Sequence, residues 1–190
     1  KPGLVLLHGN GAHAWWWAFV APYLAEDYNV AAFDLSGMGD SSWRDSYAMA
    51  SFADEPIAVA EACGMFEHVE PPVVVGHSFG GFVTMMCGAR RRLAGTILVD
   101  SPVNPPGRPG GPPHREMRPH RVYPTLTAAL ARFRLAPEQK CENHYLIDYV
   151  ARRSLKEVEG GWTWKFDPAI GHRFESSDMA ANLRAISCCI

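Results

Sequence analysis

Ser78 is the residue of this sequence whose setting most favours covalent chemistry. It lies in the segment Gly-His-Ser-Phe-Gly-Gly at 76–81, directly after three valines and directly before an apolar run with helical spacing. A glycine two residues before and another two residues after a serine, between a strand and a helix, is typical of a nucleophile elbow. We expect this turn to exclude a Cβ at Gly76 and Gly80 and to place Ser78 in a strained backbone conformation. The alternative is an ordinary strand-to-helix turn that contains a serine.

A nucleophile elbow would give two neighbouring groups a role. It lifts the hydroxyl of Ser78 clear of the sheet, where the oxygen could attack an acyl carbon and form a covalent intermediate. It also aims the backbone amide of Phe79 at the substrate. That amide opens the next helix, whose dipole favours the negative charge that develops on the attacked oxygen.

Four strands and the helices between them must position these groups. Strand and helix alternate along the first hundred residues, which predicts an α/β fold with a mostly parallel sheet and right-handed crossovers. Active sites in such sheets lie at the carboxyl ends of the strands, so polar residues there should gather along one edge. Those residues are His8, Asn10, Asp34, Ser78 and Asp100. The predicted strands are 1–7, 29–33, 72–75 and 95–99, and the predicted helices are about 15–25, 47–63 (where Pro56 could introduce a kink) and 79–91.

The composition changes after Asp100. Residues 102–113 hold six prolines and three glycines, which leaves little room for regular structure. Helical spacing follows over 116–149, where Pro137 is well placed as the first residue of a helix. An aromatic stretch at 160–168 is bounded by turn residues. A last short helix is predicted at 177–183, capped by Ser176 or Ser177, and 185–190 reads as the start of another strand.

Three segments, taken together, resemble the α/β-hydrolase fold superfamily, of the bacterial esterase and C–C hydrolase type. The segment 8–17 begins with His-Gly and ends with three tryptophans, like the HGxxxxxxW oxyanion loop of that family. Segment 34–41 resembles its DxxGxGxS loop, and 76–81 resembles its GHSxGG elbow. The resemblance implies a core at 1–100 with helices on both faces of the sheet, an inserted helical cap at 101–175, and a return to the core at 176–190.

The resemblance also implies that parts of the family pattern lie outside this sequence. Family members have two strands before the one that opens this chain and two after its last residues. The catalytic acid and histidine usually follow those later strands, in the order Ser, acid, His. The chain thus resembles a piece, truncated at both ends, of a hydrolase of roughly 250 to 300 residues. We expect the catalytic histidine beyond residue 190. Asp100 is a candidate acid within the chain, and His172 is the histidine that most resembles a catalytic one.

The resemblance assigns roles to residues near the elbow. The backbone N–H of Asn10 would join that of Phe79 in the oxyanion hole, although Asn10 also fits a plain turn. His8 would brace the oxyanion loop and His77 would pack under the elbow, so neither would be the base. Asp34 is expected to hold its own loop by hydrogen bonds to backbone amides. The tryptophans could line an acyl pocket, but packing in the core and cap is the more common fate of such residues. They are Trp15, Trp16, Trp17, Trp162 and Trp164.

The composition limits the kinds of partner that we expect. The net charge of −2 gives no reason to expect nucleic acid or an anionic membrane as a partner. The sequence contains no run of 18 apolar residues, so no membrane span is predicted. Five cysteines without a CxxC pair read as free thiols in a reducing cytosol, and we therefore predict a cytoplasmic protein. Neither a cofactor nor a metal is implied, and the oligomeric state stays open.

The leading interpretation is a serine hydrolase that cleaves an ester or related acyl bond of a small, mainly apolar molecule through an acyl-enzyme at Ser78. A C–C hydrolase or an amidase would use the same groups. A dehalogenase or epoxide hydrolase is disfavoured, because those enzymes place Asp where Ser78 stands. The alternative from another class is a non-catalytic member of the fold, acting as a small-molecule receptor or an inactive scaffold.

Overall fold

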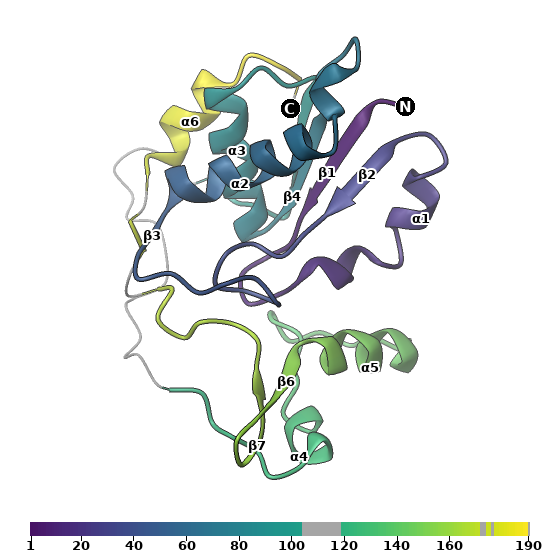
Figure 1. Ribbon diagram of the computed structural model, residues 1–190, viewed down its shortest axis with the longest axis vertical. Coiled ribbons are helices and arrows are strands. Elements are labelled where there is room, and N and C mark those ends of the chain that lie inside the picture. Colours follow the sequence, from purple (N-terminus) through teal and green to yellow (C-terminus); the bar gives the residue numbers. More distant parts are fainter. Residues whose placement is uncertain (104–118, 172–173, 176, 190) are drawn as a thin grey trace.

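A four-stranded parallel sheet forms the centre of the molecule. The computed structural model describes residues 1–103, 119–171, 174–175 and 177–189. The strands are β1 (Gly3–Leu7), β2 (Asn29–Ala32), β4 (Val73–His77) and β5 (Gly95–Val99), in the spatial order β2-β1-β4-β5 (Figure 1). All three pairings are parallel, and Leu6 of β1 lies opposite Ala32 on one side and Val75 on the other. The predicted parallel α/β architecture is therefore confirmed.

Helices cover both faces of this sheet, as predicted. On one face, α2 (Met49–Ala62), the short η2 turn (Met65–Glu67) and α3 (Phe79–Arg90) pack with Val5 and Leu7 in the main core. On the other face, Leu4 and Leu6 contact the 3-10 turn η1 (Ala14–Trp17) and the short α1 (Ala21–Leu24). Alternate side chains of β1 thus point to opposite faces, and both sets are buried, as expected for an inner parallel strand.

Two of the predicted helices differ in detail. The helix expected over 15–25 is divided into η1 and α1, with Pro22 in the first turn of α1. The helix expected from Tyr47 begins at Met49, because Tyr47–Ala48 forms a short strand, β3, that pairs with β8 (Phe174–Glu175). Pro56 lies inside α2 without ending it.

Residues 119–164 lie beyond the carboxyl ends of the main strands (Figure 1). They contain α4 (Leu126–Leu130) and α5 (His144–Arg153), followed by an antiparallel hairpin of β6 (Leu155–Val158) and β7 (Gly161–Trp164). The hairpin adds two strands to the region 101–175, where we predicted a helical cap, and its second strand falls on the aromatic stretch predicted at 160–168. Residues 161–164 pair with 155–158 across a turn at Gly160, whose φ of 84° suits glycine.

A helix is present where we predicted one after Pro137, but its predicted start at Pro137 is wrong. The last helix of this segment begins at His144, where the side chain of Asn143 accepts a hydrogen bond of 3.0 Å from the N–H of Leu146. Asparagine is among the preferred N-capping residues, and this bond satisfies one of the amides that the first helical turn leaves unpaired. The capping signal of Asn143 therefore decides where the helix starts.

The end of the chain returns to the sheet. Helix α6 (Met179–Ala185) is capped by Asp178, whose Oδ1 accepts from the N–H of Ala181 at 2.9 Å, rather than by the predicted serines. Cys189 then accepts a hydrogen bond of 2.9 Å from Thr96 N and bridges Gly95 in parallel, as predicted for the start of a strand. Ile97 and Val99 of β5 remain 48% and 40% exposed, which leaves apolar surface on this side of the sheet. None of the helices within the described residues has the length and apolar character needed to span a lipid bilayer.

Candidate active site

Ser78 occupies the turn between β4 and α3 with a positive φ. Its backbone angles are φ 51° and ψ −114°, a region that costs a residue with a side chain about 1–3 kcal/mol. The two glycines of the motif are required by space. A Cβ at Gly76 would lie 2.2 Å from the carbonyl oxygen of Gly80, and one at Gly80 would lie 2.6 Å from that of His8. The predicted strain at Ser78 and the predicted exclusion of a Cβ at both glycines are confirmed.

The end of β5 is tied directly to Ser78. The N–H of Ser78 donates to the carbonyl of Val99 at 2.9 Å. The carbonyl of Ser78 accepts two hydrogen bonds, one from the N–H of Gly81 at 3.0 Å and one from the hydroxyl of Ser101 at 2.9 Å. Sequence reasoning missed Ser101, because nothing in its local pattern distinguishes it from any other loop serine.

The loop after β1 passes beside the same turn. A Cβ at Gly9 would lie 3.1 Å from Nδ1 of His77 and 3.4 Å from Cβ of Ser78, so the backbone of Gly9 lies against the elbow. The next residue, Asn10, is exposed. Its N–H donates no hydrogen bond among the described residues. The structure thus brings the loop after β1 against the elbow, and the oxyanion roles of Asn10 and Phe79 stay predictions.

His8 holds this loop in place. Its Nε2 accepts a hydrogen bond of 3.0 Å from the N–H of Leu35, so the proton resides on Nδ1, which donates to the carbonyl of Gly9 at 2.8 Å. Burial lowers the pKa of His8 to about 4 and keeps the ring neutral. Both ring nitrogens are therefore occupied, which confirms the bracing role predicted for this residue.

No histidine is bonded to Ser78 in the part of the chain that the structure describes. His77 is half-buried and faces Gly9, in line with its predicted packing role. His172 lies outside the described residues. The prediction that the catalytic histidine follows residue 190 therefore stays a prediction.

Asp100 follows β5 in a left-handed conformation of its own, with φ 50°, and it is exposed. The described residues include no hydrogen-bond or ion-pair partner of its carboxylate. Its role as a catalytic acid also stays a prediction.

Asp34 organises the loop after β2. Its Oδ1 accepts from the N–H of Ala14 at 2.6 Å and its Oδ2 from the N–H of Asp40 at 2.7 Å. A Cβ at Gly39 would lie 2.1 Å from Oδ2, so this close approach needs glycine. The predicted loop-holding role of Asp34 is confirmed, and its bond to Ala14 links the loops after β1 and β2.

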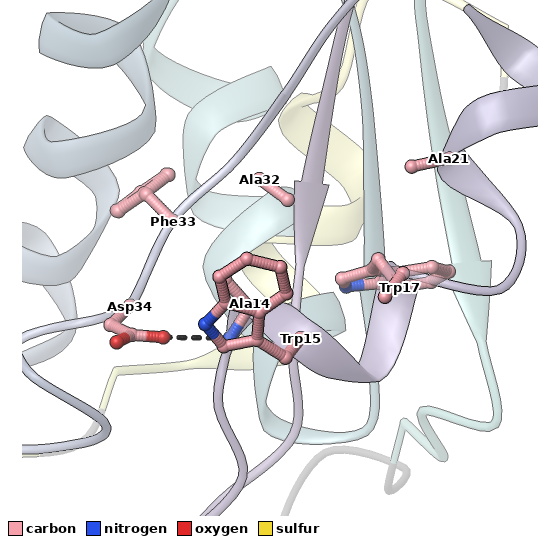
Figure 2. A pocket seen from close by; sticks show the side chains of 8 residues that line it. Ala14, Trp15, Trp17, Ala21, Ala32, Phe33 and Asp34 are labelled. Carbon is pink, nitrogen blue, oxygen red and sulfur yellow. Dashed lines mark hydrogen bonds between the residues drawn. The ribbon is translucent and has the colours of Figure 1, made fainter. Parts of the chain in front are cut away.

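The tryptophans lie in two separate places. Trp15 and Trp17 line a cavity of about 340 Å³ at the β2 side of the sheet, which Figure 2 shows together with the bond between Ala14 and Asp34. Neither this cavity nor the second one, on α5, includes Ser78. Trp164 instead packs against Tyr123 and Phe133 within the segment beyond the strand ends, the packing role considered for such residues.

Buried polar contacts join that segment to the core. The hydroxyl of Tyr47 donates to Oδ2 of Asp167 at 2.8 Å, and the N–H of Asp167 donates to the carbonyl of Gly37 at 2.7 Å. His13, on the loop after β1, is also buried and contacts Val150 and Ser154 at the end of α5. These contacts were not predicted, since they join residues far apart in sequence.

A known protein family matches this chain over most of its length. The sequence profile of the alpha/beta hydrolase family matches residues 4–187. This chain is an α/β-hydrolase. Its core, sheet order and elbow are those described above.

Individual α/β-hydrolases are similar to this one to different extents. It is 36% identical over 105 residues to the lipase LipV of Mycobacterium tuberculosis, an alignment that covers 54% of this chain and 38% of the lipase. The thioesterase domain from the curacin biosynthetic pathway superposes with a TM-score of 0.73 and 24% identity, covering 98% of this chain and 71% of that one. An esterase from Mycobacterium tuberculosis superposes with a TM-score of 0.65 and 24% identity, covering 99% and 64%. Likeness to the two structures shows the fold alone.

This hydrolase chain spans only part of its relatives. The alignments cover between 23% and 38% of the length of the first curated proteins that it matches. The activity of the whole protein is therefore a matter for proposal.

Proposed function

We propose that this α/β-hydrolase cleaves an ester or a related acyl bond through a covalent intermediate on Ser78. The observation that carries the proposal is the φ of 51° at Ser78, held between two glycines that have no room for a Cβ. Strained residues of this kind cluster at functional sites, where the surrounding structure maintains them. A serine in an ordinary turn would relax to a common conformation.

The reaction would begin with attack of the Ser78 hydroxyl oxygen on the carbonyl carbon, while a general base takes the hydroxyl proton. The carbonyl oxygen becomes an oxyanion, which the N–H groups of Phe79 and Asn10 would stabilise. Collapse of this intermediate breaks the bond to the leaving oxygen, which takes the proton back from the base and departs as the alcohol. Water then hydrolyses the remaining acyl-serine and restores Ser78. We propose that the base is a histidine beyond residue 190, and Asp100 is the candidate acid in this chain.

The segment at 101–175 would act as a cap over the site. Its described part lies beyond the carboxyl ends of the strands, the edge at which Ser78 stands (Figure 1). Contacts such as that of Tyr47 with Asp167 hold it against the core. The aromatic side chains of the cap and of the loop after β1 favour a small, mainly apolar acyl substrate over a polymer.

The test uses the full-length protein and p-nitrophenyl esters of short and medium chain length. Ser78→Ala should reduce turnover by at least about a thousandfold, as removal of a catalytic serine does in other hydrolases. Ser46→Ala removes an exposed hydroxyl and should keep the wild-type rate. A fluorophosphonate should label wild type and the Ser46 variant but not the Ser78 variant.

Two outcomes would contradict the proposal. Activity of Ser78→Ala within a few-fold of wild type would show that another residue is the nucleophile. A wild-type protein that binds apolar esters, resists labelling and turns over none of them would instead be a receptor or scaffold built on the same fold.

A further inference from the structure

The carbonyl oxygen of Ser78 is held from two sides. Gly81 donates to it from inside α3 at 3.0 Å, and the hydroxyl of Ser101 donates to it from beyond β5 at 2.9 Å. A carbonyl oxygen has two lone pairs, so both are in use. The first donor belongs to the helix itself, whereas the second comes from a different element and is supplied by a side chain.

The same peptide unit carries the N–H of Phe79. A peptide bond is planar and trans, so its C=O and N–H point in opposite directions. Fixing the direction of the Ser78 carbonyl therefore fixes the direction of the Phe79 N–H. Hydrogen bonds to a carbonyl also polarise its peptide unit, which makes the N–H a stronger donor.

We propose that Ser101 is a positioning residue, which orients and polarises the Phe79 amide as an oxyanion donor. The inference rests on the function proposed above, in which that amide receives the negative oxygen. Ser101 itself touches no reacting atom. It acts on the reaction only through the peptide unit between Ser78 and Phe79.

A second observation shows that the fold reserves space for this hydroxyl. A Cβ at Gly81 would lie 1.9 Å from Oγ of Ser101 and 2.6 Å from its Cβ. The φ of Gly81 is not in the left-handed region, so its backbone does not itself demand glycine. The absence of a side chain at position 81 is thus explained by the approach of Ser101.

One competing acceptor lies nearby. The hydroxyl of Ser101 is 3.2 Å from the carbonyl of Val99, which already accepts the N–H of Ser78. A serine hydroxyl has a single proton, and the oxygen of Ser78 is closer, at 2.9 Å. Kinetics distinguish a bond from Ser101 to Ser78 from a bond to Val99, because a bond to Val99 alone would leave the Phe79 peptide unit unaffected.

The experiment compares variants of the full-length protein that differ in this hydroxyl. Ser101→Ala should lower kcat for a p-nitrophenyl ester by about tenfold, the effect of one well-placed hydrogen bond, with KM changed by less than about threefold. Affinity for an alkylboronic acid, which mimics the tetrahedral intermediate, should fall by the same factor as kcat/KM. Ser41→Ala is the matched control: it also removes a hydroxyl-to-carbonyl bond, from Ser41 to Asp34, and should keep wild-type kinetics.

Ser101→Thr and Ser101→Val form a second matched pair. The two side chains have nearly the same shape, but only threonine keeps the hydroxyl, so the threonine variant should be the faster by about tenfold. Melting temperatures of both variants guard against a simple loss of folding. This comparison remains decisive if Ser101→Ala does not fold.

Each outcome separates this inference from the proposed function. If Ser78→Ala abolishes turnover while Ser101→Ala and Ser101→Val match wild type, the positioning role is wrong and the nucleophile stands. If Ser78→Ala stays active, the proposed function is wrong and the positioning role is wrong with it. If Ser101→Ala instead raised KM by about tenfold and left kcat unchanged, the inference would also be overturned, because that result indicates altered substrate binding.

Discussion

The Nε2 atom of His13 lies 3.1 Å from the backbone oxygen of Val150 and 3.0 Å from the hydroxyl oxygen of Ser154. His13 precedes η1 in the core, whereas both partners belong to the end of α5, so the contact joins residues 137 positions apart. The histidine is only 2% exposed, and burial lowers its pKa. This buried contact fastens the segment beyond the strand ends to the loop after β1.

Replacing His13 should therefore loosen that segment. His13→Ala removes the hydrogen bond and leaves a cavity, which should lower the free energy of unfolding by about 1–3 kcal/mol. Urea unfolding measures the loss, and limited proteolysis should cleave near α5 sooner than in wild type. His144→Ala changes an exposed histidine of the same helix and should stay within about 0.5 kcal/mol of wild type. Equal stability of the two variants would show that the His13 contact does not hold this segment to the core.

Acid should destabilise the protein through His8. Its pKa is lowered to about 4 in the folded state, against 6.5 for an unperturbed histidine. Between pH 4 and 6.5, His8 binds a proton in the unfolded chain but not in the folded protein. Its contribution to stability is therefore complete above pH 6.5 and falls as the pH drops toward 4. The total loss from this residue is about 3 kcal/mol.

Two measurements check this pH dependence. NMR of the imidazole should show His8 as the neutral, Nδ1-protonated form down to about pH 5. Urea unfolding between pH 7 and 4.5 should show a decreasing free energy, and the exposed control His144→Gln should preserve that slope. A His8 ring that titrates near 6.5 would contradict the prediction.

Gly76 should tolerate no side chain. A Cβ there would lie 2.2 Å from the oxygen and 2.3 Å from the carbonyl carbon of Gly80, and this backbone cannot move aside cheaply. Gly76→Ala should cost about 3 kcal/mol or more, or prevent folding. Gly171→Ala is the matched control, because nothing lies within 4 Å of its added Cβ. Thermal unfolding compares the two, and a stable Gly76→Ala protein would mean that the elbow is looser than described.

Asp34 should need both of its carboxylate oxygens. Each accepts a backbone N–H, from Ala14 and from Asp40, and an amide nitrogen in Asp34→Asn could not accept in its place. We expect a loss of about 1–3 kcal/mol in the free energy of unfolding, measured in urea. Asp45→Asn, at an exposed carboxylate of the same loop, should cause no more than about 0.5 kcal/mol. An equally small effect at Asp34 would refute the loop-holding role.

Features set by neighbouring residues could be predicted from the sequence. The motif of the elbow at Ser78, the apolar strand that precedes it and the hydrogen bond from Asp40 to Asp34 each involve residues close together in the sequence. Steric exclusion at Gly76, Gly80 and Gly39 leaves a direct mark on the sequence, because only glycine fits. The parallel sheet also followed from the alternation of strand and helix.

Only the tertiary structure decided how distant segments meet. The strand identity of 161–164 depends on its pairing with 155–158, and local aromatic content left it open. Ser101 and His13 look like ordinary loop residues until the sheet brings one beside Ser78 and the other beside Val150. A polar side chain such as these gains its structural role from a hydrogen-bond partner far along the chain. The residues around it in the sequence do not indicate which partner that is.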